Sequence, residues 1–327
     1  MFLKYLNNPP LILNEDNILH DIRSVTGYKN RDNISRTAAY QQFFRAYPEI
    51  KWSFLASMVS RNAGWNMCDL EGFWLPRALS DDYRKTLFLT YERANWLIFD
   101  DAYPQLLLYH YSTKIGKPMF HLCRKFNISE YIEREWLFFW EHRDQERLMT
   151  ALIVNEQNLI EQPVLQHPYY NNWVFKSFSF LFQDWLHFST VLFPTMDGRL
   201  YGLSAYNFRN LDSRIELGKK LGSILFSKEL YPHFLHFTVC TEHTGSRNDY
   251  EQYFPYKKTR ETPFLRTVYP VINHHRNGTE LWDTHRKIKK KWLIEQSVEK
   301  AELTRWYKSK QKQLEAGVAV FSLLMRK

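Results

Sequence analysis

Several ionisable side chains interrupt the most apolar stretch of this sequence. Glu92 and Asn95 are three residues apart and would share one face of a helix. Asp100 and Asp101 come shortly before Pro104, where a kink would open a gap. A carboxyl group in apolar surroundings must be paired, exposed in a cleft, or shifted in pKa. We therefore expect either a catalytic acid and base drawn from Glu92, Asp100 and Asp101, as in a hydrolase, or a buried arginine–carboxylate network that fixes helix register.

A polar run at the predicted end of one helix brings four chemically capable side chains together: Arg61, Asn62, Trp65 and Asn66. A guanidinium, two amides and an indole in one loop suit the binding of a polar ligand. In the hydrolase interpretation Arg61 would position an anion, with Asn95 as a further binding residue. The alternative is a plain turn, since asparagine and glycine suit turns for backbone reasons alone, with Trp65 as a lid over the core.

Residue types that bind metal ions recur later in the chain. His233, His236 and His243 are spaced at i, i+3 and i+10 and would share one face of a continuous helix. A rise of about 1.5 Å per residue puts the ends of this set roughly 15 Å apart, too far to converge on one tetrahedral ion. The histidines are therefore candidate metal ligands only as an adjacent pair completed from elsewhere. The alternative is histidines that pack in the core or line a groove, and no cofactor is expected.

A basic loop contains Arg260 and Arg266, and aromatic residues flank it on both sides. Cations interleaved with aromatic rings can grip phosphates and stack on bases. Lysine and arginine stems also cover aromatic surface in proteins that bind no nucleic acid, so this reading has a structural alternative.

Most of the excess positive charge lies in the tail. Residues 281–327 hold twelve Lys or Arg and five Asp or Glu, a net charge of +7, which leaves +2 of the total +9 for the rest of the chain. The densest run is Arg286, Lys287, Lys289, Lys290 and Lys291. As part of a basic amphipathic helix it would bind an anionic partner, nucleic acid in preference to a membrane surface. The alternative is a solvated terminal helix docked by its tryptophans.

Capping residues and apolar periodicity predict the helices that would position these side chains. Residues suited to begin helices are Ser35, Ser80, Ser129, Asp144 and Asp212. Gly64 and Gly116 suit helix ends, and Pro104 predicts a break or kink. We expect a hairpin or irregular loop over 194–210 and a long ordered excursion over 247–278. The predicted helices cover residues 36–47, 49–61, 81–102, 105–113, 118–126, 130–141, 145–161, 173–192, 211–231, 232–244 and 279–314.

These elements predict a mainly α fold, a large multi-helix orthogonal bundle with long aromatic-rich ordered loops and little or no sheet. Hydrophobic residues make up 44% and aromatic residues 17% of the chain, enough to build a sizeable core. Residues 162–172 contain two prolines and lack periodicity, so we expect them to form the boundary between an N-terminal and a C-terminal helical lobe. The predicted parts are an N-terminal arm over 1–32, helical lobes over 33–161 and 173–278, and a basic C-terminal helix over 279–327.

Common signatures are absent from the sequence. It contains no GxSxG, HExxH, glycine-rich phosphate loop or EF-hand pattern, which removes support from the usual hydrolase and nucleotide-binding classes. The apolar run over 318–325 is far shorter than the roughly 20 residues that span a bilayer, and the first residues lack the pattern of a secretory signal. Cys68, Cys123 and Cys240 form no CxxC pair, so we expect buried thiols and a cytoplasmic location.

Four segments carry a resemblance to a known family. They are residues 34–40 (ISRTAAY), 60–67 (SRNAGWNM), 92–95 (ERAN) and 101–106 (DAYPQL), and together they resemble the YppC-like family of Firmicutes proteins, a domain of unknown function. The likeness runs from about residue 32 to past residue 269. The resemblance implies a bacterial, cytoplasmic protein and brings no catalytic assignment, so whether the protein is an enzyme stays open.

Overall fold

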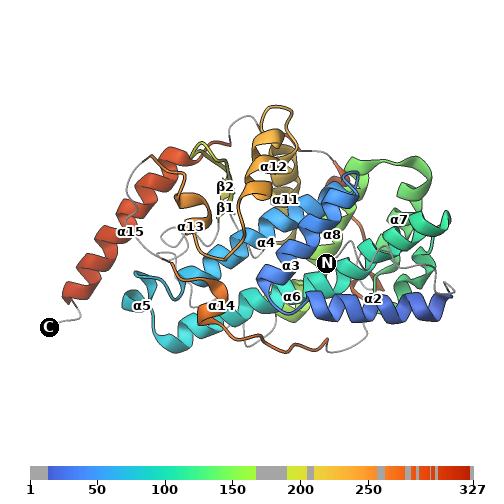
Figure 1. Cartoon of the computed structure of the whole chain (residues 1–327), viewed down its shortest axis with the longest axis horizontal. Helices are drawn as coiled ribbons and strands as arrows, with labels where there is room; N and C mark the ends of the chain where they lie inside the picture. Colours follow the sequence, from blue (N-terminus) through green and yellow to red (C-terminus); the bar gives the residue numbers. More distant parts are fainter. Residues whose placement is uncertain are drawn as a thin grey trace.

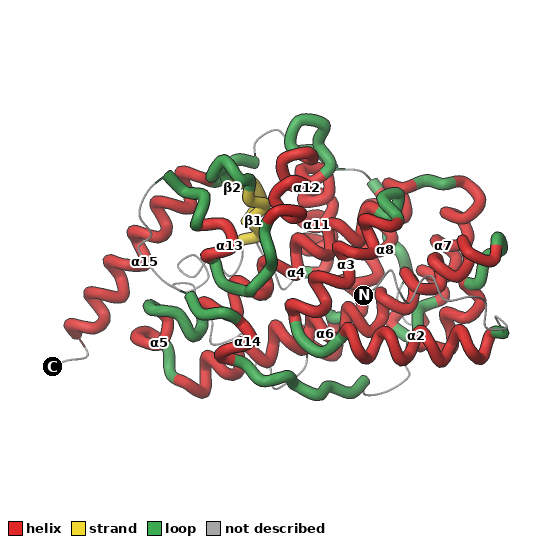
Figure 2. The backbone as a smooth tube through the Cα atoms, in the orientation of Figure 1, coloured by secondary structure: helices red, strands yellow, loops and turns green. Residues whose placement is uncertain are grey.

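The computed structural model describes residues 14–166, 190–204, 210–255, 262–276, 281–284, 287–294, 296–298 and 301–324. Within these residues helices dominate and strands are few, which confirms the predicted mainly α fold (Figure 2). The α-helices are α2 (Glu15–Lys29), α3 (Asn33–Ala46), α4 (Lys51–Asp69), α5 (Leu75–Ala78), α6 (Asp81–Ile115), α7 (Glu130–His142), α8 (Gln145–Leu159), α11 (Leu211–Leu225), α12 (Tyr231–Cys240), α13 (Asn248–Glu251), α14 (Leu265–Val268) and α15 (Thr304–Leu324). Shorter helical turns are η1 (Phe120–Phe126), η2 (Glu161–Leu165), η4 (Trp282–Thr284) and η5 (Lys290–Leu293).

The strands form one antiparallel hairpin, β1 (Thr190–Pro194) with β2 (Leu200–Ser204), in which Leu192 pairs with Gly202. This selects the hairpin from the two forms expected over 194–210. It also corrects the end of the helix predicted over 173–192, whose residues 173–189 lie outside the described ones. Asn62 of α4 holds β1 in place, because its side chain accepts from Leu192 N at 2.7 Å and donates to Leu192 O at 2.8 Å.

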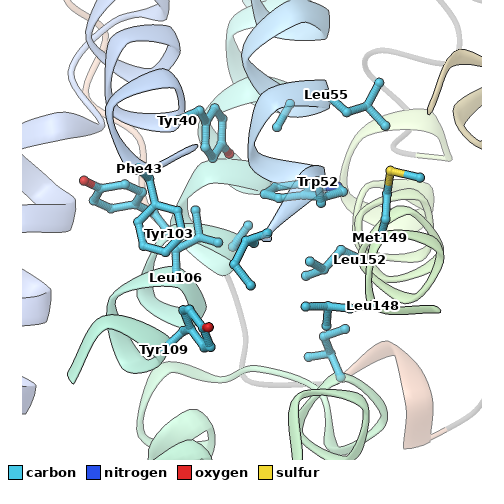
Figure 3. Packing of buried hydrophobic residues seen from close by; sticks show 14 of the residues in the cluster. Tyr40, Phe43, Trp52, Leu55, Tyr103, Leu106, Tyr109, Leu148, Met149 and Leu152 are labelled. Atoms are coloured by element: carbon cyan, nitrogen blue, oxygen red, sulfur yellow. The ribbon is translucent and has the colours of Figure 1, made fainter. Parts of the chain in front are cut away.

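The main hydrophobic core lies where α3, α4, α6 and α8 meet, and Figure 3 shows aromatic and aliphatic side chains of these helices facing one another. Tyr40 of α3 packs edge to face on Trp52 of α4, with ring centroids 5.5 Å apart. Phe193 of β1 and Ile215 of α11 belong to the same cluster. The core therefore joins segments from both predicted lobes, and a division at 162–172 stays a prediction.

Three of the helix starts predicted from capping residues are confirmed. Ser80, Ser129 and Asp144 each accept a hydrogen bond from a backbone N–H in the first turn of α6, α7 and α8. Gly116 ends α6 in the left-handed conformation, with φ of +78°. Two predicted caps are wrong by a few residues: Asp32 rather than Ser35 caps α3, and Asn210 rather than Asp212 caps α11.

Two predicted helix breaks are also wrong, although the kink that was the alternative at Pro104 stays a prediction. Pro104 lies inside α6, which is continuous from Asp81 to Ile115, and its neighbours Tyr103 and Leu106 are fully buried. Burial on this scale outweighs the roughly 3 kcal/mol that a proline costs inside a helix. Gly64 lies inside α4, where a Cβ atom would come within 2.4 Å of Asn33 Oδ1 and 2.7 Å of His243 Nε2. Glycine is required there for close packing, not for a turn.

The predicted basic helix over 279–314 is corrected as well. The described residues between 281 and 298 form only η4 and η5, and α15 begins at Thr304. Lys219 of α11 donates to Ile294 O at 2.8 Å and to Lys291 O at 3.3 Å, so these carbonyls do not serve a helix. Leu303 N donates to Leu200 O and draws the chain along β2 before α15. Among the described helices, none combines the length and the hydropathy required to cross a membrane.

Candidate functional site

The predicted polar loop after residue 60 is in fact the buried second half of α4. Arg61 is 1% exposed and donates to Thr241 O at 3.2 Å and to Thr238 O at 3.5 Å, at the C-terminal end of α12. It also donates to Gln41 Oε1 at 3.2 Å, and burial lowers the pKa of Arg61 to about 10. Arg61 therefore ties α12 to α3 and α4, just as Asn62 ties β1 to α4.

Trp65, Asn66 and the end of α4 face α13 through a set of buried polar side chains. Arg247 donates to Asp69 Oδ2 at 2.6 Å, to Asn66 Oδ1 at 2.9 Å and to the Tyr250 hydroxyl at 2.7 Å. Tyr250 donates in turn to the Tyr307 hydroxyl of α15 at 2.9 Å. We name Asn66, Asp69, Arg247, Tyr250 and Tyr307 the Arg247 network, which links α4, α13 and α15.

Trp65 and His243 converge on a second acceptor beside the Arg247 network. Trp65 Nε1 donates to Asp249 Oδ2 at 2.9 Å, and His243 Nδ1 lies 3.2 Å from the same oxygen. His243 Nε2 lies 2.8 Å from Asn33 Oδ1. Burial alone would raise the pKa of Asp249, but the hydrogen bonds from His243, Thr244 and Trp65 lower it. These groups are satisfied by one another inside the protein.

The histidines do not share the helix face on which the metal hypothesis rested. His233 and His236 are exposed on α12, which ends at Cys240, whereas His243 is buried in the following loop against Asn33 and Asp249. Within the part of the chain that the structure describes, no group of three His, Cys, Asp or Glu side chains is placed to hold a metal ion.

The predicted catalytic carboxylates lie in two buried arrangements. Glu92 is 3% exposed and forms an ion pair with Arg36 of α3. Asp101 accepts from Asn155 Nδ2 at 2.7 Å and from Gln105 Nε2 at 2.8 Å, and Arg276 lies 3.6 Å away. Burial raises the pKa of Asp101 to about 6.

Asp100 is half-buried, and burial raises its pKa as well. Glu92 and Asp101 have arginine partners, Arg36 and Arg276, as in the arginine–carboxylate alternative, and a catalytic role for the three carboxylates stays a prediction. None of Glu92, Asp100 and Asp101 lines the pocket described below.

Several of the predicted basic residues form ion pairs with carboxylates. Arg266 forms an ion pair with Asp32 at 2.8 Å and donates to Ser35 Oγ at 3.0 Å, so it connects α14 to the start of α3. Arg260 and Arg286 lie outside the described residues. Lys289 and Lys291 both pair with Asp212, at 3.0 and 2.6 Å.

Lys287 and Lys290 are exposed, as are three cations on α15: Arg305, Lys308 and Lys312. The neighbouring Trp292 is buried and donates from Nε1 to Asp212 Oδ1 at 2.6 Å. The Lys291, Trp292 and Lys289 hydrogen bonds hold the pKa of Asp212 at about 2, although burial acts in the opposite direction.

A pocket of about 140 Å³ opens between α3, α4, α6, α8, α11 and β1. We name it the Glu156 pocket. Its polar lining consists of Arg36, Tyr40, Ser60, Asn95, Glu156, Gln157 and Arg214, and the remaining wall is apolar. Burial raises the pKa of Glu156 to about 7, against the lowering effect of hydrogen bonds from Gln157 and Trp52. Such a poised carboxyl group in a pocket marks a candidate functional site.

Of the residues predicted for function, Asn95 alone lines the Glu156 pocket. Glu92 does not line the pocket but forms an ion pair with Arg36, which does. Arg61 points to the end of α12 instead. Glu156 could have been found by the rule that singled out Glu92, since it follows the apolar run over 151–154 in a predicted helix. No sequence signal marks Tyr40, because an aromatic residue at helical spacing predicts only core.

Comparison with known proteins places these features in a family. The family model for a protein of unknown function (DUF2515) matches residues 28–312, a range that holds the pocket and the α15 cations. The chain is 49% identical over 304 residues to the uncharacterized protein YppC of Bacillus subtilis (strain 168), covering 93% of this chain and 95% of that protein. No solved structure matches it. These matches confirm the resemblance seen in the sequence, and the chain belongs to the DUF2515 family of proteins of unknown function.

Proposed function

We propose that the protein binds an anionic macromolecule, nucleic acid in preference to a membrane surface, through one face of α15. The observation that carries the proposal is the exposure of Arg305, Lys308 and Lys312, which follow one another at i, i+3 and i+7. This spacing places them in a single stripe about 10 Å long. Figure 1 shows the C-terminal end of α15 running away from the helical body, and the three cations, which lie in the N-terminal half of the helix, are exposed on its surface.

A free apolar face on α15 would distinguish a membrane surface from nucleic acid as the partner. A helix that lies on a membrane buries its apolar side among the lipids. In the part of α15 whose side chains are described, Tyr307 and Leu314 are 1% and 3% exposed and pack on the protein itself. Within residues 304–317 of α15 the charged stripe therefore has no free apolar side beside it, which favours a phosphate backbone over a membrane surface.

The basic run over 287–291 contributes less to binding of an anionic partner than its number of lysines suggests. Asp212 neutralises part of Lys289 and Lys291, and the buried Trp292 anchors the segment to α11. Lys287 and Lys290 are exposed and add to the positive field. A cytoplasmic location belongs to the same proposal and is supported by the free thiols of all three cysteines.

The test measures binding of a fluorescent DNA duplex by anisotropy at 50 to 200 mM salt. Three phosphate contacts give a slope of about −2.7 in log affinity against log salt, which is roughly a 40-fold loss across this range. Replacing Arg305, Lys308 and Lys312 together by Gln should remove most of this slope and weaken binding at 50 mM salt.

The matched control is the double variant Lys289→Gln, Lys291→Gln, which should change slope and affinity much less, because both lysines form ion pairs with Asp212. Equal binding by the α15 triple variant and the unmodified protein contradicts the proposal. Tighter binding to vesicles that contain phosphatidylserine than to the duplex would reassign the partner to a membrane surface.

A further inference from the structure

The Glu156 pocket gathers hydrogen-bond acceptors that lack a positively charged partner. Glu156 accepts only from the neutral donors Trp52 Nε1 at 3.2 Å and Gln157 Nε2 at 3.1 Å, and no ion pair joins it to any Lys, Arg or His of the described ranges. The Tyr40 side chain is 3% exposed and its hydroxyl has no hydrogen-bond partner within the described chain. Asn95 uses its N–H to donate to Tyr91 O, which leaves its carbonyl oxygen as a third acceptor in the lining.

The cations in the pocket wall are engaged elsewhere. Arg36 pairs with Glu92 and donates to Asn30, and Arg214 pairs with Glu161. The two arginine charges are thus matched one for one by carboxylates outside the lining, whereas no described residue of opposite charge pairs with Glu156. A carboxylate removed from water is stabilised by a cation and by hydrogen bonds to its oxygens. The distribution of charges around the pocket therefore favours a positively charged ligand.

The size of the pocket limits what such a ligand can be. Its 140 Å³ is close to the roughly 150 Å³ of an engineered protein cavity that accepts benzene, and far too small for a nucleotide. Apolar side chains of α4 and α11, including Val59 and Leu217, form much of the wall. We propose that the Glu156 pocket binds a small organic ammonium, a primary or secondary amine carried on an apolar body about as large as a benzene ring.

In this complex the ammonium group donates to Glu156, and the Tyr40 hydroxyl and the Asn95 carbonyl oxygen are the remaining acceptors. The ligand takes the place of the proton that Glu156 holds at low pH, since burial raises the pKa of Glu156 to about 7. The other charged or titratable groups that line the pocket are Arg36 and Tyr40 of α3 and Arg214 of α11. Burial raises the pKa of Tyr40 further above its usual value, so this hydroxyl stays protonated between pH 6 and pH 8.

The experiment is calorimetric titration of the full chain with benzylamine, benzyl alcohol and benzoate at pH 6 and pH 8. The ring is shared, and the polar group is cationic, neutral or anionic. We expect benzylamine to bind about 10-fold more tightly at pH 8 than at pH 6, in line with the ionised fraction of Glu156. Benzyl alcohol should bind at least 10-fold more weakly than benzylamine at pH 8, and benzoate should not bind.

Three variants separate the pocket from the rest of the fold. Glu156→Gln should weaken benzylamine binding by roughly 10- to 100-fold and remove its pH dependence. Val59→Trp should block the site while Glu156 stays intact, because Val59 is 37% exposed and lines the pocket. Glu146→Gln, the same change at a half-exposed position of α8 outside the pocket lining, should bind like the unmodified protein. Absence of benzylamine binding, equal binding of benzyl alcohol, or full binding by Glu156→Gln each overturns the proposal.

Discussion

The Arg247 network and the Glu156 pocket are two polar regions that adjoin α4, and they differ in how their charges are matched. In the network, Arg247 is 1% exposed and reaches Asp69, Asn66 and Tyr250, with an opposite charge 2.6 Å away. In the pocket, Glu156 meets only neutral donors and the hydroxyl of its neighbour Tyr40 has no partner among the described residues. Both regions contain charges removed from water, but in the Arg247 network the charged groups pair with each other.

The difference teaches how to separate structural from functional polarity inside a protein. A charged group whose partners come from the same chain stabilises one arrangement of helices, and its loss exposes the cost of burying what remains. A charged group in a pocket without a matching charge costs stability until a ligand supplies the match. By this criterion the Arg247 network holds α4, α13 and α15 together, and the Glu156 pocket is the proposed binding site.

The largest effect is expected from removing the central cation of the network. Arg247→Met leaves Asp69 buried, without its ion pair, and should lower the free energy of unfolding by about 3 to 5 kcal/mol. Urea unfolding followed by circular dichroism measures this change. Arg199→Met is the matched control, since Arg199 and Asp197 are 45% and 48% exposed and such surface pairs contribute at most about 1 kcal/mol. Similar losses in the two variants would show that the network does not stabilise the fold.

The second prediction concerns the Glu156 pocket, where a substitution should raise the free energy of unfolding instead of lowering it. The pKa of Glu156 is about 7 in the folded protein and near 4.5 in the unfolded chain, so the folded state holds a proton more tightly. Stability from this group is present at low pH and is lost as the pH rises from 4.5 through 7, by roughly 3 kcal/mol in total. Glu156→Gln cannot ionise and should therefore be more stable than the unmodified protein at pH 8 and nearly equal to it at pH 4.5. Urea midpoints at both pH values test this, and a variant less stable at pH 8 would contradict it.

Sequence reasoning located helices where the signal was local and failed where distant residues decided. Ser80, Ser129 and Asp144 cap their helices because the cap and the N–H it accepts from are three residues apart. Gly64 was predicted to end α4, but Asn33 and His243 pack against its missing side chain, and neither is near it in sequence.

The predicted basic helix failed for the same kind of reason, because Lys219 binds the carbonyl oxygens of Lys291 and Ile294. The Glu156 pocket was out of reach of the sequence, since five helices and a strand supply its lining. A rule that flags carboxyl groups beside apolar runs would have named Glu156, but only the fold distinguishes it from Glu92, which Arg36 neutralises.

The finest test of the comparison removes one hydroxyl from each region. Tyr250→Phe takes away the group that accepts from Arg247 at 2.7 Å and donates to Tyr307 at 2.9 Å, so buried polar groups lose a partner and unfolding should become easier by about 1 to 3 kcal/mol. Tyr40→Phe removes a buried hydroxyl that has no partner in the described residues, so its stability should be unchanged or higher by up to roughly 1 kcal/mol. The two substitutions delete the same atom from side chains that are 1% and 3% exposed, so burial cannot explain a difference between them. Equal losses in urea unfolding would mean that the Tyr40 hydroxyl is already satisfied, and the pocket would then lack one of the acceptors that its ligand is expected to use.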